Sequence, residues 1–175
     1  MPLTPSNIVL NKRNARKCIE LFSFASRTIE NIRRGVEAKR WAVATVSQSA
    51  MRGRMTKARK YLHVGDRGLL YNNPTHSFTT PFIVTSTADP YEVENDVWPE
   101  PWALPFSISP LGGPHKQLPN EVAVNRWPFL RHLMRDRGGV PAAMNLTGTT
   151  VFVPIEISEA DWELILGDLA DPQSR

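Results

Sequence analysis

The sequence predicts one α+β domain, with a curved sheet or partly open barrel at its centre and helices at its flanks. Two observations carry this prediction. Short runs rich in β-branched and aromatic residues alternate with turn residues, and three other segments carry apolar residues at three- and four-residue steps. The chain has 175 residues, 41% of them hydrophobic and 22% charged, which is room for one sizeable core and not for two full domains.

The first segment with helical spacing runs from Asn7 to about Lys39. We expect one long helix, or two shorter helices broken near Ser23 to Ser26, that form an N-terminal helical extension over residues 1–39. The main domain then spans residues 40–175. The apolar residues of the helical pattern are Cys18, Leu21, Phe22, Ala25, Ile29, Ile32 and Val36.

Residues 40–73 combine two expected strands with a basic segment. Residues 41–46 are apolar and β-forming, and they predict a buried strand that opens into a loop. A cationic segment follows over residues 51–62, and a Gly-Asp turn at residues 64–68 leads into a second strand at residues 69–71. This order brings positive charge beside the mouth of a small sheet, as a nucleic-acid reader requires.

Two more strands are expected at residues 78–87 and 103–109. Pro81 inside the first of them favours a strand start or an edge position. Between the two strands lies an acidic loop with two tryptophans among prolines, and the needs of folding alone do not explain it.

The last third of the chain predicts two helices and a final strand. A short helix is expected over residues 125–134 and a strand over residues 149–155. Ser158 and the acidic residues after it open a terminal helix, because a helix dipole favours negative charge in the first turn. Its expected buried face consists of Trp162, Ile165, Leu166 and Leu169.

The net charge of +4 conceals an asymmetry. Residues 1–70 hold 15 Lys and Arg against 4 Asp and Glu, whereas residues 71–175 hold 6 against 13. The first part is therefore the expected polyanion-facing part, although a soluble basic surface would give the same count.

The sequence gives no sign of a cofactor, a metal site or a membrane segment. Its single cysteine, Cys18, cannot form an internal disulfide, so a reducing, cytoplasmic location is expected. The four histidines, at positions 63, 76, 115 and 132, lie at no ligand spacing, and no apolar run is long enough to span a bilayer. A serine elbow, a phosphate loop and paired catalytic carboxylates are also missing, so we expect no catalytic activity.

The order of these parts resembles the EVE domain, a member of the PUA-like superfamily that also includes YTH and ASCH domains. The resemblance covers roughly residues 40–170. Its most specific pieces are GDRGLLY, similar to the family's turn into an aromatic strand, and ISEADWELI, similar to its closing helix. It implies a PUA-like pseudo-barrel with flanking helices and a pocket for a modified base.

Such domains serve as specificity modules of modification-dependent restriction systems. The resemblance therefore implies a reader of modified cytosine or adenine, in DNA by preference or in RNA, with the base flipped out of a duplex or taken from a single strand. A nuclease would then be a separate domain or subunit.

Candidate residues follow from this resemblance. Tryptophans supply flat walls for stacking, and asparagine amides suit a base edge. The expected base pocket consists of Trp98, Trp102, Ser47, Asn72, Asn73 and Trp41, and the expected phosphate contacts are Arg52, Arg54, Lys57, Arg59 and Lys60. Packing explanations stay open, because the tryptophans would equally cap the core and Asn72-Asn73-Pro74 would equally be a turn.

Two alternatives remain at the sequence level. Some ASCH members resemble hydrolases or ribonucleases built on Lys, Thr and Glu, and Lys57, Thr85 and Glu92 are the corresponding residues here. The other alternative is a protein-interaction module whose N-terminal helices bind a partner.

Overall fold

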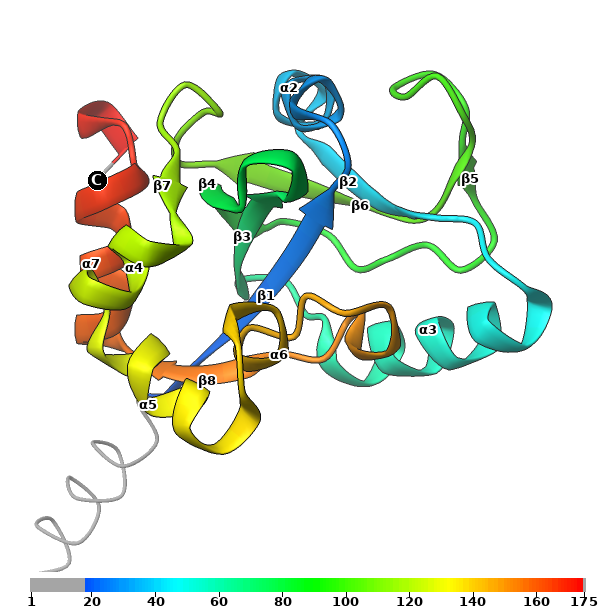
Figure 1. Cartoon of the computed structure of the whole chain (residues 1–175). Helices are drawn as coiled ribbons and strands as arrows, with labels where there is room; N and C mark the ends of the chain where they lie inside the picture. The colour runs from blue at the N-terminus through cyan, green and yellow to red at the C-terminus, as the bar shows by residue number, and fades with distance from the viewer. Residues whose placement is uncertain (1–17, 175) are drawn as a thin grey trace, which may run out of the picture.

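The computed structural model describes residues 18–174 and centres on one mixed sheet (Figure 1). Its main path has the strand order β2-β6-β4-β3-β1-β8, and two short strands attach to it, β5 to β6 and β7 to β4. β1 and β3 run parallel, whereas the other pairs are antiparallel. This architecture confirms the predicted α+β fold class.

The elements have the following bounds. The strands are β1 (Cys18–Ser26), β2 (Arg40–Ala44), β3 (Arg67–Asn72), β4 (Ser77–Val84), β5 (Val93–Glu94), β6 (Trp102–Pro110), β7 (Leu118–Pro119) and β8 (Ile155–Ser158). The α-helices are α2 (Ile29–Ala38), α3 (Gln48–Tyr61), α4 (Asn120–Arg126), α5 (Pro128–Arg137), α6 (Val140–Ala143) and α7 (Glu159–Leu169). Short 3-10 turns are η1 (Asn73–Thr75), η2 (Gly148–Thr150) and η3 (Pro172–Ser174).

The predicted N-terminal helix is wrong for residues 18–26, which form β1 in the interior of the sheet. Leu21 packs into one apolar core, whereas Phe22 and Phe24 pack into another. A strand that is buried on both faces lacks the two-residue alternation of apolar and polar residues, so the apolar residues of β1 resemble a helical pattern. The helix is confirmed only over α2, and residues 7–17 of the predicted helix lie outside the described residues.

Two apolar cores occupy the two sides of the sheet. In β3, Leu69 and Tyr71 enter the first core, which also holds residues of α4, α5 and α7, whereas Leu70 enters the second core beside α2 and α3. Trp41, Trp98 and Trp102 belong to the second core, so all three are tied to the packing of α2 and β2.

The strands expected near residues 41–46, 69–71, 78–87 and 103–109 are confirmed as β2, β3, β4 and β6. The expected edge position of Pro81 is wrong, because β4 lies between β3 and β6. The register of β3 and β4 shifts between Leu69 and Tyr71, and this irregularity accommodates a residue without an N–H. In β3, position 68 requires glycine, because an added Cβ would lie 2.0 Å from Cζ of Phe82 in β4.

The C-terminal part differs from the prediction in its details. The expected strand at residues 149–155 is wrong, because β8 begins only at Ile155, after η2. The helix expected at residues 125–134 is two helices, α4 and α5, separated by the buried Trp127. The terminal helix α7 is confirmed with its four buried residues, and Ser158 and Asp161 form a capping box at its start.

Among residues 18–174, no helix combines the length and apolar character needed to cross a membrane.

Candidate nucleic-acid-binding cavity

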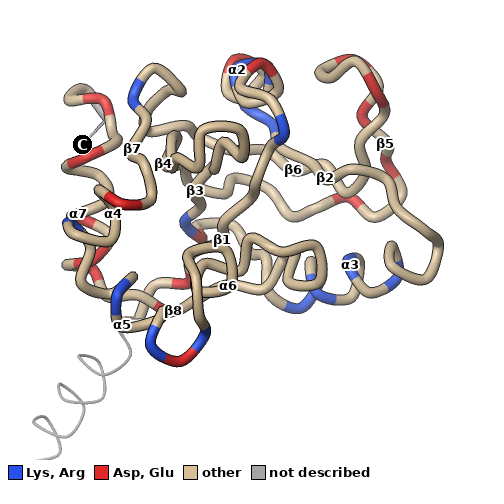
Figure 2. Tube along the Cα trace, in the orientation of Figure 1, with Lys and Arg blue, Asp and Glu red and all other residues tan. Residues whose placement is uncertain are grey.

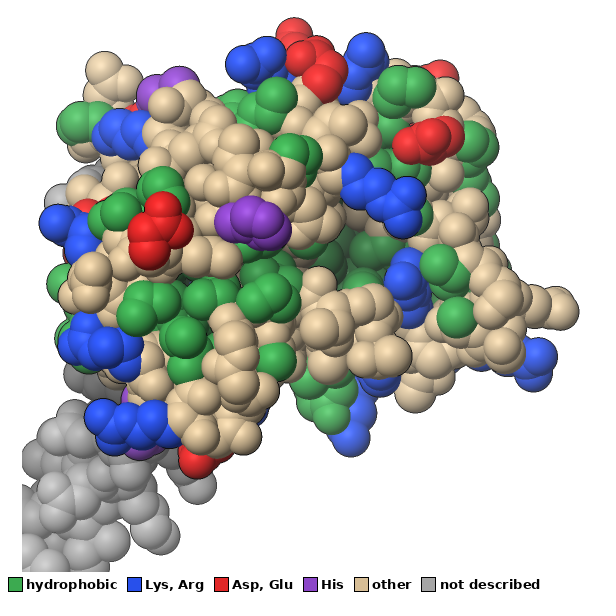
Figure 3. All heavy atoms as spheres, viewed as in Figure 1, with side chains coloured by type: hydrophobic (Ala, Val, Ile, Leu, Met, Phe, Trp, Pro, Cys, Tyr) green, Lys and Arg blue, Asp and Glu red, His purple; other side chains and the backbone are tan. Residues whose placement is uncertain are grey.

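A cavity of about 710 Å³ opens beside the C-terminal end of β1. Its wall comes mainly from four segments, residues 23–28, 41–46, 100–102 and 145–148. The space-filling view shows a hollow whose floor is hydrophobic and whose rim carries Lys and Arg side chains (Figure 3). Both its volume and its mixed lining are typical of a small-molecule or nucleotide site.

Three tryptophans form one aromatic cluster at this cavity. Trp98 and Trp102 stack with ring centroids 4.2 Å apart and planes at 13°. Trp41 stands nearly perpendicular to both, with its centroid 5.7 Å from Trp98 and 5.4 Å from Trp102. Helix α2 approaches Trp41 closely at Gly35, where an added Cβ would lie 2.8 Å from Cε3 of Trp41.

The three rings differ in what they offer to a ligand. Trp41 and Trp102 lie on the cavity wall, whereas Trp98 lies behind Trp102 and its Nε1 donates to the carbonyl oxygen of Asn31 at 2.9 Å. Rings in van der Waals contact leave no room for a base between them. Trp102 and Trp41, which are 7% and 1% exposed, therefore supply the aromatic part of the cavity wall, and Trp98 supports Trp102 from the core side.

The expected polar pocket residues are spread over different places. Asn73 lies on the cavity wall. Asn72 is buried, and its Nδ2 donates to Oγ1 of Thr75 at 2.9 Å. Ser47 is exposed and caps α3, with its Oγ accepting from the backbone N–H of Ala50 at 3.4 Å. Of the three, the structure brings only Asn73 to the cavity.

The expected phosphate-binding residues all lie on α3, a helix at one flank of the molecule, where Figure 2 shows several Lys and Arg positions. Arg54 lies on the cavity wall and donates to the carbonyl oxygen of Ala44 at 2.9 Å. Burial lowers the pKa of the Arg54 guanidinium. Lys57 donates to the carbonyl oxygen of Thr149 at 2.7 Å, whereas Arg52, Arg59 and Lys60 are exposed.

Several cavity residues are absent from the predicted site, because the sequence predicts a helical extension over their segment. Arg27, Thr28 and Asn31 lie on the wall where β1 passes into α2, and Thr28 Oγ1 caps the helix by accepting from the N–H of Asn31 at 3.1 Å. A threonine before a helical pattern is a known start signal, so the break at this point was detectable. Asn145 and Thr147 complete the opposite wall, and no sequence signal marked them.

The residues of the hydrolase alternative are engaged separately. Glu92 pairs with Arg40 at 3.3 Å, and Lys57 bonds to Thr149. No hydrogen bond or ion pair within residues 18–174 joins Lys57, Thr85 and Glu92 to one another. The alternative therefore gains no support from this arrangement.

No protein-family model and no curated protein matches the sequence. Solved structures match the fold. The YTH domain of the Zygosaccharomyces rouxii MRB1 protein, in complex with N6-methyladenosine RNA, is 14% identical, with a TM-score of 0.53 over 85% of this chain and 85% of that chain. The Toxoplasma CPSF4 YTH domain in its apo form is 14% identical, with a TM-score of 0.51 over 91% and 94%. The Pho92 YTH domain in complex with m6A is 14% identical, with a TM-score of 0.51 over 85% and 82%.

The fold is similar to that of YTH domains. The expected PUA-like architecture agrees with this result at the level of the fold, whereas the narrower EVE assignment stays a prediction. At 14% identity the likeness concerns the fold alone, so a function for this YTH-like chain has to be inferred from the residues that line its cavity.

Proposed function

We propose that this chain binds single-stranded RNA and holds one modified base in the cavity beside Trp102 and Trp41. The observation that carries the proposal is the cavity itself, which combines an aromatic wall with two arginine side chains and asparagine side chains on one YTH-like fold. N6-methyladenosine is the first base to test, because two of the solved neighbours were crystallised with it.

Each part of the cavity supplies one component of such recognition. Stacking on Trp102 would contribute about 1–3 kcal/mol, and the perpendicular Trp41 would bound the base at its side. Asn73 offers both a donor and an acceptor at the wall, which suits the edge of a base. A methyl group on the base would gain by leaving water for this apolar floor.

The basic residues would hold the strand without reading it. Arg27 and Arg54 lie on the cavity wall, and Arg52, Arg59 and Lys60 continue along the exposed face of α3. Contacts of this kind fix the position of phosphates and make affinity depend on salt. We therefore expect the strand to leave the cavity along α3.

The sequence favoured modified DNA and a nuclease partner, and both remain hypotheses for the same cavity. A base flipped from duplex DNA would meet the same aromatic wall, and a nuclease would have to come from another domain or subunit. A reducing, cytoplasmic location, in keeping with a single cysteine, is likewise proposed.

Fluorescence anisotropy with short labelled oligonucleotides tests the proposal. We expect RNA with one N6-methyladenosine to bind about 10-fold or more tightly than the unmodified strand, as one methyl group in an apolar pocket allows. The matched arms are single-stranded and duplex DNA that carry N6-methyladenine or 5-methylcytosine. Equal weak binding of every strand would leave only affinity for polyanions, and a preference for modified duplex DNA would replace RNA as the substrate.

A further inference from the structure

A second cluster of ligating side chains lies outside the cavity, where β1 passes the turn between α3 and β3. Glu20 comes from β1, and His63 and Asp66 come from the turn. One carboxylate oxygen of each acid and one imidazole nitrogen lie within 4.8 Å of one another. The cavity wall includes none of the three residues.

The backbone holds these side chains in place. The N–H of His63 donates to Oδ2 of Asp66 at 2.7 Å, which leaves Oδ1 for a further partner. Gly65, with φ +95°, makes the tight turn possible and donates to the carbonyl oxygen of Val84 at 2.8 Å. Glu20 lies on a strand that pairs with both β3 and β8, so its position relative to the turn is fixed.

The negative charge of the cluster has little direct compensation. Within residues 18–174, neither Glu20 nor Asp66 has a Lys or Arg nitrogen within 4.0 Å, and the ion-pair contact of Asp66 is with Nδ1 of His63 at 3.9 Å. The neighbouring Arg67 turns its Nη1 to the carbonyl oxygen of Gly65 at 2.9 Å. A cation between the two acids would therefore meet two carboxylates that no Lys or Arg within residues 18–174 contacts directly.

Both acids are half-buried, so their carboxylates are partly withdrawn from water, whereas His63 is exposed.

We propose that Glu20, His63 and Asp66 bind one Zn²⁺ ion through two carboxylates and one imidazole, with water as the fourth ligand. Three protein ligands and an open position form a common zinc arrangement, and nitrogen and oxygen ligands suit this ion. Tetrahedral binding at about 2.0–2.2 Å requires ligand atoms about 3.4 Å apart, so the cluster has to contract. The side chain of His63 is 61% exposed and can make this movement.

Such an ion would connect β1 to the turn that leads into β3. Binding to the folded chain alone would raise the melting temperature by about 5–10 °C at a free Zn²⁺ concentration 100 times the dissociation constant. This proposal is independent of RNA binding, because the ion and the base occupy different parts of the molecule.

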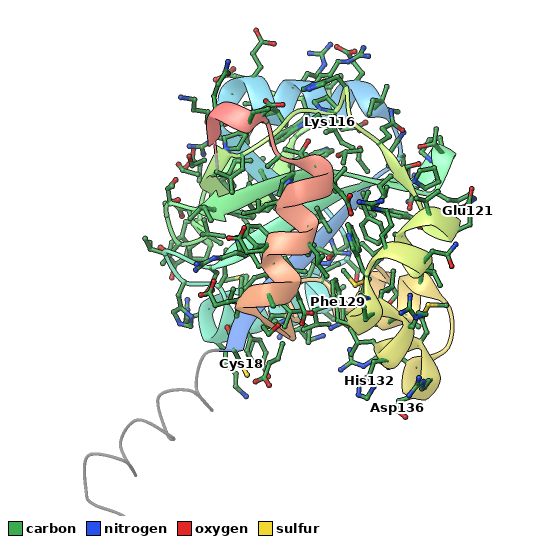
Figure 4. The ribbon with its side chains drawn as sticks, turned by 90° about the vertical axis from the view of Figure 1, so that its left-hand side faces the viewer. Cys18, Lys116, Glu121, Phe129, His132 and Asp136 are labelled. Carbon is green, nitrogen blue, oxygen red and sulfur yellow. The ribbon has the colours of Figure 1, made fainter. Side chains whose placement is uncertain are left out.

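Isothermal titration of chelator-treated protein with Zn²⁺ tests the proposal, with Ca²⁺ and Mg²⁺ as comparison ions. We expect one Zn²⁺ per chain, and at least a tenfold loss of affinity in His63→Ala and in Glu20→Gln. Glu20→Gln keeps the size of the side chain, so it guards against a failure to fold. The matched control is His132→Ala, because His132 projects from α5, an element that contributes nothing to the cluster (Figure 4).

X-ray absorption of the zinc-loaded protein completes the test, because Cys18 lies on the same strand as Glu20. A shell of nitrogen and oxygen atoms alone at about 2.0–2.2 Å is the expected result. Absence of stoichiometric Zn²⁺ binding, unchanged affinity in both variants, or a sulfur atom at about 2.3 Å would overturn the proposed ligand set.

Discussion

Replacement of Trp102 separates the proposed stacking platform from the rest of the aromatic cluster. Trp102 lies on the cavity wall and is 7% exposed, whereas Trp98 is 2% exposed and does not line the cavity, so Trp102 is the ring of this pair that a base can reach. If the base stacks on Trp102, its removal costs about 1–3 kcal/mol of binding free energy, which is about a 5- to 150-fold loss of affinity. Trp102→Ala should therefore abolish the preference for modified RNA.

Two further variants make this prediction specific. Trp102→Phe keeps an aromatic ring and should retain most of the preference. Trp98→Phe loses the 2.9 Å hydrogen bond to Asn31, which should cost about 0.5–1.5 kcal/mol of folding free energy while RNA affinity stays within about twofold. Anisotropy titrations with modified and unmodified RNA measure the binding, and thermal unfolding measures the stability of each variant.

The result that refutes this assignment is equally definite. If Trp102→Ala remains folded and still prefers modified RNA, the base does not stack on this ring. If Trp98→Phe loses as much selectivity as Trp102→Ala at an unchanged melting temperature, the base lies between the two rings, and the stacked arrangement has to open before binding.

Three other predictions concern charge and stability. Lys57→Ala and Arg54→Ala should weaken the binding of all strands alike. Each should lower the slope of log K against log salt by about 0.7 for each lost phosphate contact, which titrations at several salt concentrations measure. A change in selectivity instead would show that the residue contacts the base. Gly68→Ala should destabilise the fold by about 1–3 kcal/mol in urea unfolding, because its Cβ would lie 2.0 Å from Phe82, and an unchanged midpoint would contradict this packing. Ser158→Ala removes the capping box of α7 and should cost about 1 kcal/mol in the same assay, and an unchanged midpoint would contradict the contribution of this cap.

Much of the sheet followed from local chemistry. The β-branched and aromatic runs at β2, β3, β4 and β6 are half-buried or buried strands with turn residues at their ends, so their composition was informative. The start of α7 was equally clear, because Ser158 and the acids after it satisfy the first N–H groups of the helix.

The remaining elements depend on contacts that are distant in sequence. β1 is a strand because it pairs with β3 and β8, which lie more than 40 residues further along the chain. A local apolar pattern does not contain this pairing. The expected strand at residues 149–155 failed for a related reason, since only Ile155 and the residues after it reach the edge of β1.

The candidate site likewise has features that the sequence predicts and features that depend on packing. The importance of the tryptophans was visible from their unusual loop, but their order from core to cavity depends on packing against α2 and Asn31. Asn72 and Asn73 are neighbours in sequence, yet one is buried against Thr75 and the other lies on the cavity wall. Asn72 is the last residue of β3 and Asn73 the first of η1, so the chain turns between them, and sequence proximity does not decide which of them meets a ligand.

The position of β1 between β3 and β8 also determines how the chain can be divided. A fragment that begins at residue 40 would lack β1, so β3 would present a row of unpaired N–H and C=O groups and β8 would lose its neighbour in the sheet. Helix α7 would then follow β8, a strand without its hydrogen-bonded neighbour β1. The two ends of the described chain therefore depend on each other for their place in the sheet, and a fragment that starts at residue 40 should aggregate rather than fold.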